Sequence, residues 1–286
     1  MSSAGGPLAQ LASWPVEHAA AAVVGPSGVL ATAGDLERQF KLASVTKPLA
    51  ALALLVAVEE EAIDLDAPIV GRTDDGADLG TELPGATVRH LLAHASGLSP
   101  ERRRRAAAPG SRRIYSNAGF DVLGDMLVTA TDMSFENYLQ EAVFVPLGMR
   151  SSRLEGSPAK DGVSTVTDLI AMLTELLSTS GLLSPGTRQE LRSVQYPGLR
   201  GVLPGYGGQD SNDWGLGFEI RDHKVPHWTS VQNSAATYGH FGRSGTMFWV
   251  DPEAGLALVA LADRDFDEWS ISAWPALSDA VLDAFG

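Results

Sequence analysis

A serine and a lysine three residues apart precede the longest apolar stretch of the chain. That stretch covers residues 48–58 and follows directly on Lys47, with Ser44 one helical turn earlier. Residues three apart share one face of a helix, so Lys47 would hold its amine near the Ser44 hydroxyl. Serine is a poor nucleophile until a base takes its proton. Lysine can be that base only if burial lowers its pKa from about 10.4 by roughly 3 units. The pair therefore predicts catalysis by an activated serine.

The same residues also fit a purely structural interpretation. Ser44 or Thr46 could cap a buried helix over residues 44–61, with Lys47 extending its amine to solvent. A second Ser-x-x-Lys lies at residues 157–160, in a polar loop that contains proline and that no apolar helix follows. We interpret this second copy as unrelated to catalysis.

Two further groups could complete a site. Tyr115 and Asn117 stand just before an expected helix at 119–129; a tyrosine can pass a proton to a leaving group, and an asparagine can support a lysine. His240, Gly242 and Arg243 lead into an expected strand at 246–250. A glycine there lets the backbone approach a ligand, and a strand-edge N–H can stabilise an oxyanion. Taken singly, each group also fits an ordinary turn.

The order of the three motifs resembles that of the penicillin-recognising serine hydrolases. With tyrosine in the second motif, the sequence looks closest to class C β-lactamases, D-Ala-D-Ala carboxypeptidases and family VIII esterases. The resemblance spans nearly the whole chain. It extends to the segments at 88–98, 109–112, 144–149 and 214–217.

The resemblance implies a role for each motif. Ser44 would be the acylated nucleophile, and Lys47 with Tyr115 the proton-transfer pair. Asn117 would bind substrate and support Lys47. His240 would stand where class C β-lactamases carry a lysine. The backbone N–H groups of Ser44 and Arg243, with Gly242 between His240 and Arg243, would form the oxyanion hole. The resemblance implies no cofactor and no metal, and His223 and His227 are not expected to form a metal site.

The expected fold is α+β (α/β in some schemes), of the β-lactamase/transpeptidase type. An antiparallel sheet would draw on both termini: a hairpin near 21–31 and strands at 215–221, 239–241, 246–250 and 256–262, with a closing helix at 272–285. A weak helix is expected over residues 8–22. Residues 1–66 and 160–286 would form the sheet domain and residues 67–159 a mostly helical one, with the active site between them.

Charge and composition narrow the partners. The net charge of −14 disfavours nucleic acid, and the arginine run at 102–105 is expected to be a solvated loop because no aromatic residues interleave it. No apolar run reaches the roughly 20 residues that a bilayer requires. No basic segment precedes residue 38, so we expect no signal peptide and a cytoplasmic protein. The sequence does not indicate an oligomeric state.

The expected function is hydrolysis of a small ester or amide through an acyl-serine, with esterase or amidase and D-peptidase activity favoured. A β-lactamase or penicillin-binding carboxypeptidase is the alternative. It is less favoured because His240 is mostly neutral at pH 7 and anchors a carboxylate less well than lysine. Arg243 could anchor the carboxylate instead. A catalytically silent scaffold of the same fold is a second alternative. It is suggested by the short connection at residues 99–108, where relatives usually carry a longer segment.

Overall fold

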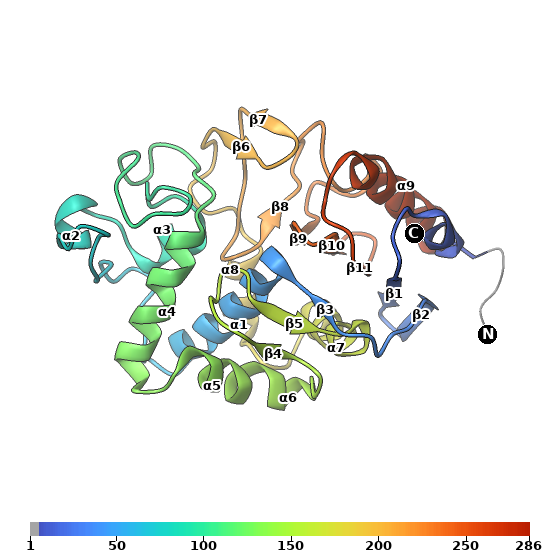
Figure 1. The fold of residues 1–286 in the computed structure, drawn as a ribbon, viewed down its shortest axis with the longest axis horizontal. Helices are drawn as coiled ribbons and strands as arrows, with labels where there is room; N and C mark the ends of the chain where they lie inside the picture. The colour runs from blue at the N-terminus through green and yellow to red at the C-terminus, as the bar shows by residue number, and fades with distance from the viewer. Residues whose placement is uncertain (1–5) are drawn as a thin grey trace.

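A six-stranded antiparallel sheet forms the centre of the molecule in this computed structural model, which describes residues 6–286 (Figure 1). Its strand order is β2-β1-β11-β10-β9-β8, so the N-terminal hairpin pairs with the last strand of the chain. The strands are β1 (Ala19–Gly25), β2 (Gly28–Ala33), β8 (Glu219–Ile220), β9 (Tyr238–Gly242), β10 (Thr246–Asp251) and β11 (Leu256–Ala262). This confirms the expected sheet built from both termini.

The central strands β1, β10 and β11 are buried on both faces, which explains why they are almost continuously apolar. Val24 and Val259 face a core shared with α1 (Thr46–Glu59) and α7 (Val166–Leu177). Their neighbours Val23 and Leu258 face a second core under α9 (Glu268–Phe285) and the short 3-10 turn η1 (Ala9–Ser13). Successive side chains of a strand point to opposite faces, so a sheet covered on both sides needs apolar residues at every position.

Helix α1 is the central element beneath the sheet. Nearly all of its side chains are buried, including Lys47, as its dense apolar sequence predicts. It packs against the helical region that follows it in the chain. No helix in residues 6–286 is both long and apolar enough to cross a membrane.

Helices and two small sheets fill the part of the chain between β2 and β8. The expected helices near 88–94, 119–129, 134–145, 167–178 and 185–194 are all present. The division into two domains stays a prediction. The elements of this part are β3 (Phe40–Lys41), the 3-10 turn η2 (Ala43–Val45), α2 (Leu79–Glu82), α3 (Val88–Leu92), α4 (Asn117–Thr131), α5 (Phe135–Leu139), the π-helical η3 (Gln140–Phe144), α6 (Val145–Leu147), β4 (Arg153–Leu154), β5 (Gly162–Ser164), α8 (Pro185–Leu191), β6 (Gly201–Leu203) and β7 (Gly207–Gln209).

The helix predicted over residues 8–22 is wrong beyond its first turns. Only η1 is helical, and the alanine-rich segment after Pro15 becomes strand β1, which pairs with β11 in the register Ala19 to Ala262. Alanine favours a helix in isolation, but pairing in the sheet and burial on both faces override that preference. The strand expected at 215–221 is also shorter, because only β8 pairs with β9.

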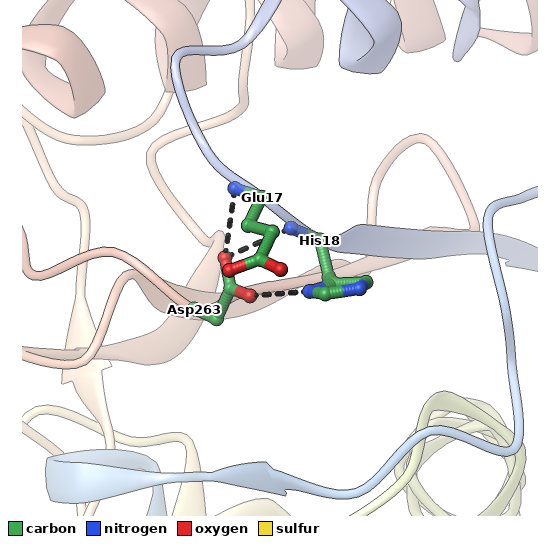
Figure 2. A group of neighbouring side chains, drawn as sticks. All are labelled: Glu17, His18 and Asp263. Carbon is green, nitrogen blue, oxygen red and sulfur yellow. Dashed lines mark hydrogen bonds and ion pairs between the residues drawn. The ribbon is translucent and has the colours of Figure 1, made fainter.

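A carboxylate ties the start of β1 to the end of β11. Asp263 accepts hydrogen bonds from the backbone N–H groups of Glu17 and His18, at 3.1 and 2.9 Å, and its other oxygen lies 2.7 Å from His18 Nδ1 (Figure 2). These bonds satisfy donors at the point where the chain enters the sheet. The cluster therefore joins the two ends of the fold.

Candidate active site

Ser44 lies in the turn η2, immediately before α1, and its side chain caps nothing. The helix begins after Val45 without a side-chain cap, so the prediction of a cap by Ser44 or Thr46 is wrong. Thr46 Oγ1 instead donates to the carbonyl of Ala43 (2.6 Å) and accepts from Gly162 N (2.9 Å). Ala43 has φ +45°, a strained left-handed conformation typical of functional turns. Ser44 is therefore presented on a constrained turn with its hydroxyl available.

Lys47 extends toward that hydroxyl from the first turn of α1. Its Nζ lies 3.5 Å from Ser44 Oγ, 2.6 Å from Asn117 Oδ1 and 2.8 Å from the carbonyl of Ala159. The side chain is fully buried. Burial lowers the pKa of Lys47 to about 7, against opposing effects of Glu101 and Asp121. Lys47 can therefore lose its proton near neutral pH.

The neutral amine fits its three neighbours. An –NH₂ group has two hydrogens and one lone pair. Asn117 Oδ1 and the Ala159 carbonyl are pure acceptors here, so they take the two hydrogens. The lone pair is then left for the Ser44 hydroxyl. The site thus holds Lys47 as a base directed at Ser44.

Tyr115 and Asn117 are held by a short network at the start of α4. Ser116 caps this helix by accepting from Gly119 N (3.0 Å), and its own N–H donates to His94 Nδ1 (3.1 Å). The Tyr115 ring covers Lys47, with Nζ 4.6 Å from the ring centroid. Asn117 Nδ2 donates to Glu101 at 2.6 Å. Both polar atoms of the Asn117 amide are therefore engaged, the oxygen by Lys47 and the nitrogen by Glu101.

The Tyr115 hydroxyl is buried and keeps its proton at neutral pH. Burial raises the pKa of Tyr115, which the nearby Ser44 side chain only partly offsets. The hydroxyl makes no hydrogen bond of normal geometry with any residue in 6–286. A neutral phenol of this kind can donate a proton and cannot act as the resting base.

His240 is a neutral histidine in strand β9. Burial lowers the pKa of His240 to about 3, and its Nδ1 lies 2.7 Å from the carbonyl of Phe241. Because that carbonyl can only accept, Nδ1 carries the hydrogen and Nε2 is an unprotonated acceptor. His240 therefore provides no positive charge.

Gly242 and Arg243 bring the end of β9 against the turn of the serine. A Cβ on Gly242 would stand 2.3 Å from the carbonyl oxygen of Leu42, so this close approach requires glycine. Ser244 Oγ and Thr246 Oγ1 donate to the carbonyls of Lys41 and Leu42, at 2.6 and 2.8 Å. These bonds fix the Arg243 backbone beside Ser44.

One cavity of about 750 Å³ collects these side chains. Of the residues predicted from sequence, Ser44, Tyr115, Asn117, His240 and Arg243 line it, whereas Lys47 is buried behind its wall. Its walls are completed by Ala43, Glu101, Lys160, Asp161, Leu203, Pro204, Gly205, Trp214, Glu219, Phe241 and Phe266.

The family model for Beta-lactamase matches residues 19–281. The chain belongs to the beta-lactamase family. Members of this family are serine hydrolases, and the match covers all strands of the central sheet and every residue that lines the cavity.

Solved and curated relatives agree with this assignment. A crystal structure described as a beta-lactamase (Mb2281c) from Mycobacterium bovis is 52% identical, covers 98% of this chain and 99% of its own, and superposes with a TM-score of 0.91. Esterase EstB from Burkholderia gladioli is 27% identical over 85% of this chain and 81% of its own length. The D-alanyl-D-alanine-carboxypeptidase/endopeptidase AmpH from Escherichia coli is 26% identical over 57% of this chain and 51% of its own length.

Several cavity residues of this beta-lactamase-family chain were not predicted from its sequence. The second Ser-x-x-Lys, interpreted as unrelated, contributes the Ala159 carbonyl to Lys47, and Lys160 lines the cavity. Glu101 comes from the short connection at residues 99–108 and binds Asn117. No local motif marks these residues, because loops distant in sequence bring them to the site.

A buried ion-pair network lies behind the same cavity. Glu219 accepts from Lys224 Nζ at 2.6 Å, lies 2.9 Å from His227 Nε2 and also accepts from the indole N–H of Trp228. His227 Nδ1 lies 2.8 Å from Thr229 Oγ1, so both ring nitrogens of His227 are engaged. His227 thus belongs to an ion-pair network, and His223 is largely exposed beside Asp222.

Proposed function

We propose that this protein is a serine hydrolase that cleaves a small ester or amide through an acyl-Ser44 intermediate. The observation that carries the proposal is the arrangement of Lys47, whose two hydrogens are engaged by Asn117 and Ala159 while its lone pair faces Ser44. Lys47 takes the serine proton, and Ser44 Oγ attacks the substrate carbonyl carbon.

Tyr115 and the backbone complete the first half-reaction. The neutral Tyr115 phenol, beside Ser44, donates a proton to the leaving group as the bond to the acyl carbon breaks. The Ser44 and Arg243 backbone N–H groups stabilise the oxyanion, supported by the close approach that Gly242 permits. Water then releases the acyl group and restores Ser44.

The charges around the cavity favour a neutral ester or amide over a β-lactam carboxylate. His240 is neutral, and the two cations that line the cavity, Arg243 and Lys160, are exposed to solvent, with Arg243 87% exposed. Exposed charges bind an anion weakly because solvent and salt screen them. Glu101 and Asp161 line the same cavity and repel a carboxylate.

A cytoplasmic location also stays a prediction.

Labelling with a fluorophosphonate tests the nucleophile. We expect the probe to label the wild type and not Ser44→Ala. Ser27→Ala, at an exposed serine between β1 and β2, is the control and should label like the wild type. Equal labelling of the wild type and Ser44→Ala would exclude Ser44 as the nucleophile.

A substrate panel then separates the candidate activities. We expect short-chain nitrophenyl esters or D-amino-acid amides to be turned over faster than a chromogenic cephalosporin. Preference for the cephalosporin would favour a β-lactamase instead. If no compound is turned over and none forms an adduct with Ser44, the scaffold interpretation is the better one.

A further inference from the structure

The side-chain amide of Asn117 is held between an amine and a carboxylate. Its Oδ1 accepts from Lys47 Nζ at 2.6 Å, and its Nδ2 donates to Glu101 Oε1 at 2.6 Å. The two ends of an amide differ, because the oxygen only accepts hydrogen bonds and the nitrogen only donates them. The end that faces Lys47 therefore decides which hydrogen bonds the base can make.

Only one of the two amide orientations leaves the lone pair of Lys47 free. With Oδ1 toward Lys47, the amide takes one hydrogen of the amine, and the lone pair stays available for Ser44. After a half turn, Asn117 would present Nδ2 to Lys47 instead. Its N–H would then donate to the lysine lone pair, which must take the serine proton in the reaction. The orientation of this amide is therefore a condition for catalysis.

Glu101 distinguishes the two orientations by its chemistry. An ionised carboxylate accepts hydrogen bonds and donates none. Glu101 can therefore bond to the nitrogen of Asn117 and repels the oxygen. A glutamine in its place could bond to either end of the amide, and a lysine could bond only to the oxygen.

The backbone around Glu101 is fixed against the start of α4. The N–H groups of Asn117 and Ala118 both donate to the carbonyl of Pro100, at 2.7 and 3.2 Å. The carbonyl of Ser99 accepts from the hydroxyl of the serine before Asn117, at 2.7 Å. These bonds hold the chain next to Asn117, so the backbone positions the exposed side chain of Glu101.

We propose that Glu101 is a positioning residue, which fixes the amide of Asn117 with its oxygen toward Lys47 and so keeps the lysine lone pair directed at Ser44. The proposal rests on the acyl-Ser44 mechanism proposed above. It gives the short connection at residues 99–108 a function in that mechanism.

Glu101 also acts on Lys47 through its charge. Burial lowers the pKa of Lys47, and the Glu101 carboxylate acts to raise it. Without this carboxylate the pKa of Lys47 should fall, and the acid limb of the rate should move to lower pH. The other titratable groups around Lys47 are Asp121, Lys160, Tyr115, His94 and His240. A role through charge alone would thus make the base more available, whereas loss of the amide orientation would make it less effective.

Glu101→Gln and Glu101→Lys separate these two roles when kcat/KM for a nitrophenyl ester is measured between pH 5 and 9. Glutamine accepts both orientations, so the rate on the plateau should fall about 2-fold. Lysine selects the rotated amide, so the plateau should fall about 10-fold, the population change that one hydrogen bond produces. In both variants the acid limb should move to lower pH.

The control is Arg102→Gln, at an exposed neighbour in the same connection, which should keep the plateau and the acid limb of the wild type. An undiminished plateau in Glu101→Lys would overturn the positioning role and leave only an effect of charge. A lower plateau with an unmoved acid limb would also overturn it, because that result indicates general disruption of the site.

An NMR spectrum reads the amide without catalysis. The chain has four asparagines, at positions 117, 137, 212 and 233, so labelling asparagine with nitrogen-15 gives few side-chain signals, and Asn117→Asp identifies the relevant one. We expect the Asn117 signal to change in Glu101→Lys and to stay unchanged in Arg102→Gln. The same signal in the wild type and Glu101→Lys would overturn the positioning role. The expected signals in a wild type that forms no acyl-enzyme would instead overturn the proposed function.

Discussion

The molecule buries two of its four lysines, and their surroundings differ in one respect. Lys47 is 0% exposed and is surrounded by an amide oxygen, a backbone carbonyl and a hydroxyl. Lys224 is 3% exposed, donates to the backbone carbonyls of Asp213 and Ile220, and is paired with the Glu219 carboxylate at 2.6 Å. Both lie near the same cavity, since Glu219 lines its wall.

That one carboxylate separates a reactive amine from a structural ion pair. Burial lowers the pKa of both lysines, but at Lys224 the charge of Glu219 opposes the effect. Lys224 and His227 in turn hold the pKa of Glu219 well below its usual range, although burial acts to raise it. The groups bonded to Lys47 are uncharged, so burial makes it a base, whereas a bonded carboxylate opposes the effect of burial at Lys224.

The largest effect should come from Lys47→Met. Removing the base should lower kcat/KM for a nitrophenyl ester by on the order of 10³-fold, because Ser44 loses the group that takes its proton. Lys41→Met, at an exposed lysine six residues earlier, is the control and should retain wild-type activity. Activity of Lys47→Met within a few fold of wild type would remove Lys47 from the mechanism.

Lys224→Met should affect stability more than chemistry. It leaves Glu219 buried without its lysine, which should lower the free energy of unfolding by about 3–5 kcal/mol in urea titrations. The double variant Lys224→Met, Glu219→Gln should recover part of this loss, because the buried negative charge is gone. A stability loss no larger than that of Lys47→Met would contradict the contrast between the two sites.

The pH dependence of the rate sharpens the same contrast. Lys47 must be neutral to act, and its pKa is about 7. We therefore expect kcat/KM to fall about 10-fold for each pH unit below 7 and to level off above it. Stopped-flow acylation rates between pH 5 and 9 measure this profile. A rate independent of pH across this range would argue against lysine as the base.

The smallest effect concerns Lys160, whose positive charge helps to lower the pKa of Lys47. Lys160→Gln removes that charge, so the pKa of Lys47 should rise and the acid limb of the rate should move to higher pH by less than about 1 unit. The plateau rate should stay near that of the wild type. Movement of the limb to lower pH would contradict the assigned influence of Lys160.

Contacts between residues close in sequence could be predicted, whereas contacts between residues distant in sequence could not. Ser44 and Lys47 are three residues apart on one helix, so their proximity follows from local geometry. The predicted cap by Ser44 or Thr46 and the predicted helix over residues 8–22 were wrong, because each depends on a partner distant in sequence. Thr46 Oγ1 accepts a hydrogen bond from Gly162 N, and the segment beginning at Ala19 pairs with β11.

The sequence by itself determined the apolar helix, the order of the three motifs and the residues that could do chemistry, since helical spacing and side-chain type are local properties. The tertiary structure decided the protonation states and the contents of the cavity. A pKa depends on desolvation and on nearby charges. The charges that act on Lys47 are those of Glu101, Asp121 and Lys160, at sequence separations over which spacing predicts no contact.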